Sequence, residues 1–354
     1  DFFPFEFRKI VDTLRVQLPV YNESVLEDPK QQRYFDLYQN GLGYNNLIYA
    51  AIVLGDLKKK LEIEPDCYTA LLIEEPEAHL HPQLQNIFFS YLGTLNKTIG
   101  FQIFISSHSP TITAKAELDC LIVLQNQDSQ IKAFSVSASA LGDSKKYLSK
   151  FLDVTKSQLF FSNGVILVEG ISESLLLPIF SKMLGEDYDI EKKGVELVNI
   201  NGVAFEHFGK LFNAETENQR LSCRCAILTD DDRTTQSAEI SSRASKAKEL
   251  EKHLLKVELA EKTFEYELFK TGNNKDILMP IFKEMHPIAA DRVIQGASTE
   301  ECADSFVDRI NANKAKSELA QRLALKLEED STTRSSFQVP EYIAKAIKWV
   351  VKGE

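Results

Sequence analysis

The chain has 354 residues, of which 44% are hydrophobic and 26% are charged, a composition typical of a folded globular protein and not of a disordered one. At about 100–200 residues per domain, this length predicts two or three domains. The formal net charge of -11, from 41 basic and 52 acidic residues, argues against a simple basic coat for nucleic acid. It still allows an enzyme whose carboxylates hold metal ions that face phosphate groups.

The sequence gives no sign of secretion or of a membrane span. No run approaches the roughly 18 apolar residues that a spanning helix needs. The first residues, DFFPFEFRKIVD, lack the basic and apolar regions of a signal peptide. The five cysteines are odd in number and lack metal-ligand spacing, so we expect reduced, buried thiols. We therefore predict a cytoplasmic protein without a membrane partner.

Up to about residue 160 the sequence alternates between helical and strand patterns. The continuous apolar run that ends in the carboxylates of residues 74–77 is typical of a parallel strand buried on both faces. The predicted elements are a helix over 44–61, a strand within 67–77, a helix over 81–95 and strands over 101–105, 118–127 and 131–136.

A second α/β pattern begins near residue 164. The predicted elements are strands over 164–170, 195–200 and 225–232, helices over 173–184 and 205–212, a charged helix within 236–252, and mostly helices over 264–352. Strands separated by helices indicate βαβ connections and a parallel sheet. We predict a first domain over 1–140, a linker over 141–163 and a second domain over 164–354.

The most specific string of the first half is LLIEEPEAHLHP, at residues 71–82. Its apolar strand delivers Glu74 and Glu75 to the strand's carboxyl end, where ligands bind in open α/β sheets. One carboxylate can hold Mg²⁺ through water while the next polarises an attacking water. Alone, the string is equally compatible with a solvated acidic turn. The next strand favours a site, because it ends in SSHSP, and His108 matches the switch histidine of ABC-type ATPases.

Together, EEPEAHLHP and SSHSP resemble the ATPase half of the OLD (overcoming lysogenization defect) family, which fuses an ABC-type ATPase to a Toprim nuclease. The wider group includes the Gabija nucleases. The resemblance implies ATP as a ligand and a homodimer or higher oligomer, since a signature segment of one protomer completes the other's nucleotide site. Here that segment keeps Gly43 and Asn46 but has Gly41 where the family favours serine. Both glycines are equally compatible with ordinary turn residues.

The phosphate-binding loop G-x-x-x-x-G-K-[ST] is absent from the sequence, and the chain lacks an initiator methionine. Resembling proteins carry that loop near their N-terminus. We therefore expect the chain to be the C-terminal part of a longer protein and its ATPase module to be incomplete.

The second constellation is a set of carboxylates at strand ends. VILVEGISE places Glu169 after a buried strand and Glu173 about one helical turn further, with Gly170 expected to allow the sharp turn. CAILTDDDR places Asp230 and Asp232 at the end of a later strand, where Asp231 is expected to point away. Each string alone is compatible with a solvated loop. In one parallel sheet they would share an edge and could hold two Mg²⁺ or Mn²⁺ ions about 3.5–4 Å apart.

This second pattern resembles a Toprim domain, and two further segments favour the OLD type. KTFEYELF resembles the motif that follows the last Toprim strand, which makes Glu265 another metal ligand. NKAKSELAQRLA resembles the segment with an active-site lysine, aligned at Lys316, although Lys314 is close enough to be the counterpart. The family usually has glycine after this lysine, and this chain has Ser317. A lysine there can offset charge that develops on the phosphate.

The resemblance implies an α/β chain: the C-terminal part of an ABC-type ATPase followed by a Toprim domain with a helical insertion. The implied function is metal-dependent cleavage of DNA, regulated by the ATPase and used in anti-phage defence, in some relatives with a UvrD-like helicase. The alternative is an ATP-driven DNA clamp of the recombination type with a non-catalytic Toprim fold. The clustered carboxylates speak against it, because buried charge is costly unless paired. A topoisomerase or primase is disfavoured, since neither a tyrosine nucleophile domain nor a zinc ribbon is visible.

Overall fold

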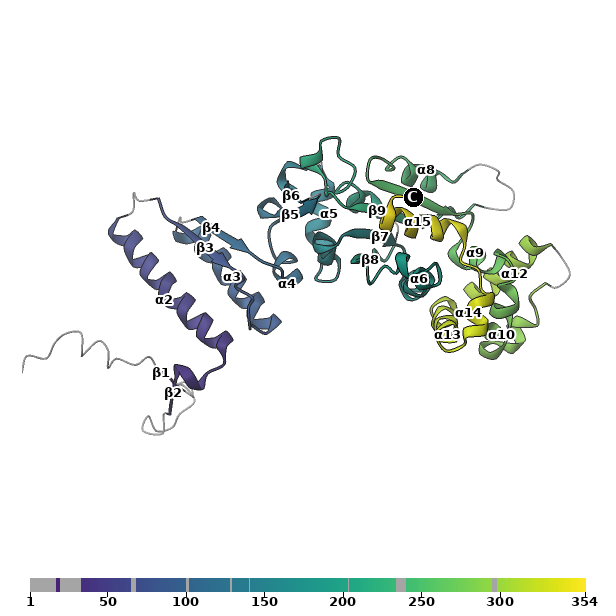
Figure 1. Ribbon diagram of the computed structural model, residues 1–354, viewed down its shortest axis with the longest axis horizontal. Coiled ribbons are helices and arrows are strands. Elements are labelled where there is room, and N and C mark those ends of the chain that lie inside the picture. Colours follow the sequence, from purple (N-terminus) through teal and green to yellow (C-terminus); the bar gives the residue numbers. More distant parts are fainter. Residues whose placement is uncertain are drawn as a thin grey trace, which may run out of the picture. The chain divides into compact units, whose positions relative to one another are not determined.

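The computed structural model describes residues 17–19, 33–64, 68–99, 102–127, 129–139, 141–202, 204–233, 240–294 and 298–354 (Figure 1). The chain divides into two compact units, Asp1–Lys115 and Ala116–Glu354. Both are mixed α/β units, as predicted. Within the described ranges, no helix is long and apolar enough to cross a membrane.

In the first unit, two parallel strands pair in register, with Ala70 opposite Gln102 and Glu74 opposite Ser106. The elements of this unit are β1 (Gln17–Pro19), β2 (Tyr34–Asp36), the 3-10 turn η3 (Leu37–Gln39), α2 (Leu42–Ile63), β3 (Ala70–Glu74), α3 (Pro82–Ile99), β4 (Gln102–Ser106) and α4 (Pro110–Thr113). The predicted helices and strands of this part are therefore present, with shifts of a few residues at their ends.

Among the residues that the structure describes, only one face of the sheet of the first unit is covered. Leu71 and Ile73 pack with Leu54 and the core of the two long helices. On the other face, Leu72 is 74% exposed. The prediction that this strand is buried on both faces is thus wrong for the described unit, because no described element of the unit covers its second face.

The second unit is built on a parallel sheet with strand order β10-β9-β7-β8 among the described residues. The strands are β5 (Ile122–Gln127) and β6 (Gln130–Ser135), an antiparallel pair, and β7 (Gly164–Val168), β8 (Val195–Asn199), β9 (Arg224–Asp230) and β10 (Leu255–Ala260). The helices are α5 (Ser144–Phe151), α6 (Ile171–Met183), α7 (Phe205–Gly209), α8 (Ser242–Lys248), α9 (Phe264–Lys270), α10 (Lys275–Met285), α11 (Pro287–Ala290), α12 (Thr299–Ala312), α13 (Lys316–Glu329), α14 (Ser331–Ser336) and α15 (Glu341–Lys352).

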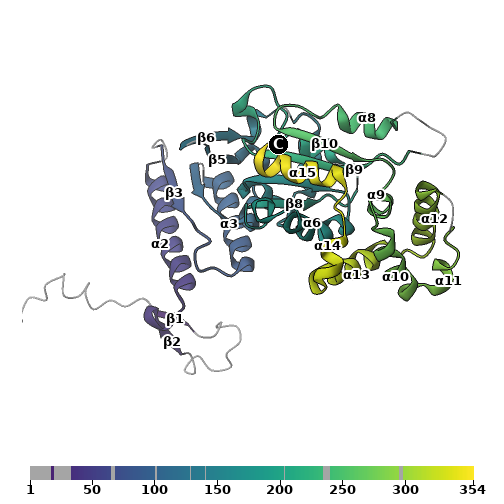
Figure 2. The same cartoon turned by 45° about the vertical axis from the view of Figure 1, so that its right-hand side comes forward.

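Strand β7 is fully buried because a hydrophobic core lies on each side of it. Ile166 and Val168 join the core formed with α6, α13 and α15, whereas Val165 and Leu167 join the core on the opposite face. Helix α15 packs across β9, β10 and β7 (Figure 2). Packing on both faces fixes the position and direction of β7, the strand that ends beside Glu169.

Residues 116–163 pack with the second unit. The segment predicted as a linker contains α5 and the 3-10 turn η6 (Lys156–Phe161), and its Leu148 and Leu159 are buried in the same core as Val165. The apolar spacing of these residues within a polar stretch explains the packing. As a boundary between two domain families, 141–163 stays a prediction.

Candidate metal centre

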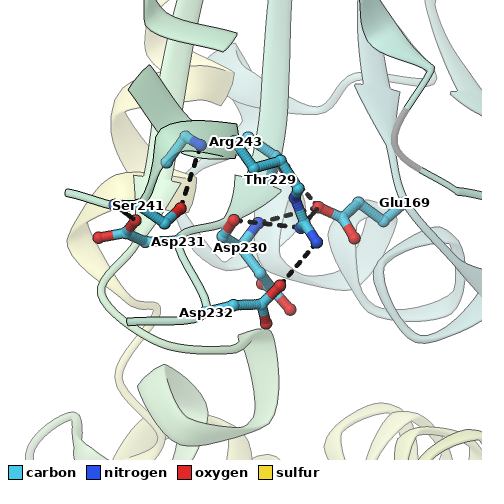
Figure 3. Close-up of polar contacts among 8 residues, drawn as sticks. Glu169, Thr229, Asp230, Asp231, Asp232, Ser241 and Arg243 are labelled. Atoms are coloured by element: carbon cyan, nitrogen blue, oxygen red, sulfur yellow. Dashed lines mark hydrogen bonds and ion pairs between the residues drawn. The ribbon is translucent and has the colours of Figure 1, made fainter. Parts of the chain in front are cut away.

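The carboxyl ends of β7 and β9 meet at one edge of the parallel sheet (Figure 3). Glu169 directly follows β7, and its Oε1 accepts hydrogen bonds from the hydroxyl of Thr229 and, at 3.0 Å, from the backbone N–H of Asp230. Both donors belong to the end of β9. The structure thus brings two of the predicted metal ligands, Glu169 and Asp230, together for the reason that the sequence gives, since parallel strands end at the same edge.

A guanidinium joins this edge. Arg243, on α8, donates from Nη2 to Glu169 Oε1 at 2.8 Å and from Nη1 to Asp232 Oδ2 at 2.6 Å. The same Nη2 lies 3.2 Å from the backbone oxygen of Asp230. Figure 3 shows the guanidinium between the two acidic side chains. Three predicted site residues are therefore linked by one cation that the sequence analysis did not identify.

Asp231 is directed away from the other two aspartates, as predicted, but it is not solvated. Its side chain is fully buried and accepts from Arg233 Nε at 2.5 Å and from the backbone N–H of Ser241 at 2.7 Å. These donors hold the pKa of Asp231 below its usual value, despite the opposing effect of burial. Ser241 is the N-cap of α8, so Asp231 fastens the start of the helix that carries Arg243.

A second acidic group lies beside the first. Glu173 is in the first turn of α6, and Glu265 is in the first turn of α9; they are 8% and 4% exposed. Lys316, the first residue of α13, places its Nζ 2.9 Å from Glu265 Oε2. Lys316, the predicted active-site lysine, therefore forms an ion pair with Glu265, the fifth of the predicted metal ligands.

Crowding and burial shift the proton affinities of this group. Burial, with help from Glu265 and Glu169, raises the pKa of Glu173 to about 7. Burial and the same kind of repulsion raise the pKa of Asp230 well above its usual value. Burial acts to lower the pKa of Lys316, but Glu265, Asp230 and Glu173 hold it above its usual value. Negative charge is in excess, which is the electrostatic condition in which a divalent cation binds.

The donor set fits a hard divalent cation, because carboxylate oxygens are the ligands that such cations prefer. As the side chains stand, no three His, Cys, Asp or Glu residues of the described part converge on one metal position. In this arrangement, Arg243 uses one oxygen of Glu169 and one oxygen of Asp232.

Three residues of this edge were missed from the sequence: Thr229, Arg243 and Ser241. Thr229 had a signal, because it immediately precedes the first aspartate of the DxD pattern. Arg243 had none, because it is 74 residues from Glu169. The expected role of Gly170 is not supported. Its φ of -153° is ordinary extended backbone, so the turn does not depend on glycine.

In the first unit, the predicted nucleotide-site residues Asn46, Glu74 and Glu75 line one cleft between α2 and β3. Glu75 Oε1 lies 3.6 Å from His108 Nε2, and the two side chains are 58% and 83% exposed. Glu77, not predicted as a site residue, orders the loop, since its Oε1 accepts from Ser107 Oγ at 2.8 Å and from the His108 N–H at 2.7 Å.

Gly43 is buried in the first turn of α2 and has a packing role. A Cβ there would lie 2.3 Å from the backbone oxygen of His79, so the helix approaches this loop too closely for any side chain. Asn46 contacts the same loop through its Nδ2, 3.5 Å from the backbone oxygen of Ala78. The predicted signature segment therefore lies against the loop that follows Glu75.

A parallel sheet that carries a glutamate after one strand and a DxD pair after its neighbour is the arrangement of a Toprim-type domain. Residues 160–232 match the family described as "Overcoming lysogenization defect protein-like, TOPRIM domain", and residues 6–113 match the AAA ATPase domain family. The chain thus matches the two kinds of domain that the resemblance to the OLD family predicts, and this resemblance is confirmed.

Curated relatives agree with this assignment. The chain is 24% identical to endonuclease GajA of Bacillus cereus (strain HuB5-5) over 89% of this chain and 53% of GajA. It is 28% identical to the Old nuclease of Escherichia phage P2, over 55% and 34% of the two chains, and 28% identical to the OLD nuclease of Thermus scotoductus, over 53% and 35%. The chain therefore spans about half or less of the curated relatives that it matches.

Proposed function

We propose that the second unit hydrolyses phosphodiester bonds of DNA with divalent metal ions, Mg²⁺ or Mn²⁺. The observation that carries the proposal is the placement of Glu169, Asp230 and Asp232 at one sheet edge, next to buried Glu173 and Glu265. Such a concentration of carboxylates is costly for the fold unless cations balance it. The nuclease names of the relatives support the same function.

The residues would divide into two ligand groups. Glu169, Asp230 and Asp232 would hold one ion, and Glu173 and Glu265 would contribute to a second. When bound, the ions would activate a water nucleophile and stabilise the leaving oxygen. Lys316, 2.9 Å from Glu265 and 40% exposed, would reach the phosphate from the side of α13 and offset its developing charge. Lys314 stays the alternative for this role.

The first unit would regulate this activity through ATP in the complete protein. Glu74, Glu75, Asn46 and His108 would contact nucleotide and its Mg²⁺, with Glu75 as the group that polarises water and Gly43 as the packing residue of the signature segment. We infer a homodimer or higher oligomer, a role in anti-phage defence and, where it exists, a UvrD-like helicase partner from the family resemblance.

The test is cleavage of supercoiled plasmid by the chain in Mn²⁺, in Mg²⁺ and in excess EDTA, together with Glu169→Gln. We expect nicked or linear product with metal, none in EDTA, and none with the variant. Glu258→Gln is the matched control, because Glu258 is a half-buried carboxylate on β10 of the same sheet, outside the site. Metal-independent DNA binding without cleavage by the unmutated chain would instead favour the clamp function.

A further inference from the structure

The cationic group of Arg243 occupies the space between two of the proposed metal ligands. Its Nη2 is 2.8 Å from Glu169 Oε1, and its Nη1 is 2.6 Å from Asp232 Oδ2 (Figure 3). A divalent cation that bridges these same two oxygens would need the position of the guanidinium. The guanidinium and the metal therefore compete for one position.

We propose that Arg243 is an exchangeable counter-ion of the metal centre: its guanidinium balances Glu169 and Asp232 when metal is absent and is displaced when a divalent cation binds. This inference rests on the proposed metal site and adds to it a residue that sets the metal concentration at which the site fills.

The oxygen at the centre of this contact has no room for an additional ligand. Glu169 Oε1 already accepts from the Thr229 hydroxyl, the Asp230 N–H and Arg243 Nη2. A carboxylate oxygen has about two lone-pair sites, so three donors saturate it. Of these donors, the backbone N–H of Asp230 is fixed by the sheet, whereas the Thr229 hydroxyl can rotate and the Arg243 side chain can withdraw. These two changes free a lone pair of the oxygen for a metal ion.

The surroundings of Arg243 allow that withdrawal. Its side chain is 39% exposed, and Asp232 is 50% exposed, so a path to solvent exists on this side. Its Nε is buried without a hydrogen-bond partner, so the pocket does not satisfy the whole guanidinium. An arginine built into the fold as a permanent ion pair would be expected to use all of its donors.

The backbone that carries Arg243 is held in place independently of the ion pairs. The Ser241 N–H donates to buried Asp231 at 2.7 Å, and the Ser241 hydroxyl caps α8 by accepting from the Ala244 N–H at 3.2 Å. These contacts involve neither Glu169 nor Asp232. Displacement of the guanidinium therefore requires rotation of one side chain and leaves α8 where it is.

The experiment measures Mn²⁺ affinity directly, by isothermal titration calorimetry on the chain without DNA, for the unmutated chain, Arg243→Gln and Arg243→Lys. Removing the competing cation should tighten Mn²⁺ binding about tenfold in Arg243→Gln, the size of one charge-assisted contact. The Mn²⁺ affinity of Arg243→Lys should lie between those of the unmutated chain and Arg243→Gln, because an ammonium group lacks the planar fork with which a guanidinium bridges two carboxylates. Lys246→Gln is the matched control, since it removes one positive charge from an exposed position of the same helix.

Thermal unfolding gives a second readout that does not depend on activity. Without metal, Arg243→Gln should unfold several degrees below the unmutated chain, because Glu169 and Asp232 then repel without compensation. Saturating Mn²⁺ should remove most of that difference. Lys246→Gln should match the unmutated chain with and without metal.

The outcomes separate this inference from the proposed function. Unchanged or weaker Mn²⁺ affinity in both arginine variants, with cleavage intact in the unmutated chain, overturns the exchange and leaves the nuclease standing. Absence of Mn²⁺ binding in every chain, including the unmutated one, overturns both. Tighter binding in Arg243→Gln but not in Lys246→Gln supports the exchange.

Discussion

The two units present their acidic residues in opposite ways. In the first unit, Glu75 and His108 are 58% and 83% exposed, and their closest atoms are 3.6 Å apart. In the second unit, Glu173 and Glu265 are 8% and 4% exposed and lie among like charges. Exposed carboxylates are solvated and cost the fold little, whereas buried ones are costly unless they are paired or protonated. The carboxylates of the second unit would therefore be stabilised by a bound cation, whereas those of the first unit are stabilised by water.

The packing beneath the two sites differs in the same direction. Strand β7, which leads to Glu169, has a core on both faces, but β3, which leads to Glu75, leaves Leu72 74% exposed. A strand fixed on both sides holds its end with little freedom. We therefore expect substitutions at the second site to lower the rate of DNA cleavage. Substitutions at the first site should leave the cleavage rate and the stability of this chain nearly unchanged.

The largest expected effect is at Asp230. Asp230→Asn keeps the shape of the side chain but removes a charge from the carboxylate group, so single-turnover plasmid cleavage in Mn²⁺ should fall by about three orders of magnitude. Far-ultraviolet circular dichroism should show an unchanged fold. Cleavage at the parental rate by a folded variant would refute the two-metal proposal.

The next effect concerns the lysine. Lys316→Ala should lower the cleavage rate about a hundredfold while changing DNA binding much less, because the lysine acts on charge that develops in the transition state. Lys314→Ala is the matched comparison, since Lys314 adopts a left-handed conformation just before α13, and the ion pair of Glu265 is made by Lys316. Binding in Ca²⁺ and cleavage in Mn²⁺, measured on the same preparations, separate the two effects. A larger loss with Lys314→Ala would transfer the role to that residue.

An acidic chain should also hold DNA mainly through its metals. The net charge of -11 makes long-range attraction to phosphates weak or repulsive, so affinity should rise with Ca²⁺ and fall with salt. The local basic candidates are Arg233, Lys314, Lys316 and Arg322. Of these, Arg233 pairs with Asp231, Arg322 with Glu318 and Lys316 with Glu265, so each of the three would have to exchange a carboxylate partner for a phosphate. Tight binding in EDTA would contradict this expectation.

The strand-end carboxylates could be predicted because their sequence signal is local. The run VILV ends directly at Glu169, and the run CAIL is separated from Asp230 by Thr229 alone. Because parallel strands end at one edge, Glu169 and Asp230 had to meet. Strand β10 was missed because its apolar residues are interrupted by Lys256 and Glu258 and its segment lies among charged residues. Its absence from the prediction did not disturb the expected meeting of Glu169, Asp230 and Asp232, because these three residues lie at the ends of β7 and β9.

Arg243 and the role of Asp231 could not be predicted from spacing. The chain leaves the strand alternation at Asp232, which has a φ of +52°, so the side-chain directions after Asp230 depend on the loop and on where α8 begins. The pairing of Glu265 with Lys316 depends on two helices, α9 and α13, that are distant in sequence. The resemblance to a family identified these two residues, but periodicity did not.

A moderate effect is expected at Asp231. Asp231→Asn weakens two contacts of a fully buried carboxylate, to Arg233 and to the Ser241 N–H, and should cost about 1–3 kcal/mol in the free energy of unfolding. Asp187→Asn is the control, because Asp187 is 74% exposed in its pair with Lys352, and such surface pairs contribute little. Urea denaturation of the unmutated chain, Asp231→Asn and Asp187→Asn measures the change in the free energy of unfolding for each variant. Equal stability of all three would show that Asp231 does not anchor α8.

The smallest effect is expected at Glu75. The Glu75 and His108 side chains are largely exposed, and the chain has no phosphate-binding loop sequence, so ATP turnover by this chain should be negligible. Glu75→Gln should then leave plasmid cleavage within about twofold of the unmutated chain, since it changes neither a buried charge nor a ligand of the second site. Phosphate release measured with malachite green tests the expected ATP turnover, and the plasmid assay on the same preparation tests the expected cleavage. ATP turnover at the rate of an intact ABC ATPase, abolished by Glu75→Gln, would mean that the exposed group of the first unit is a complete catalytic site, and the contrast between the two units would then lie in packing alone.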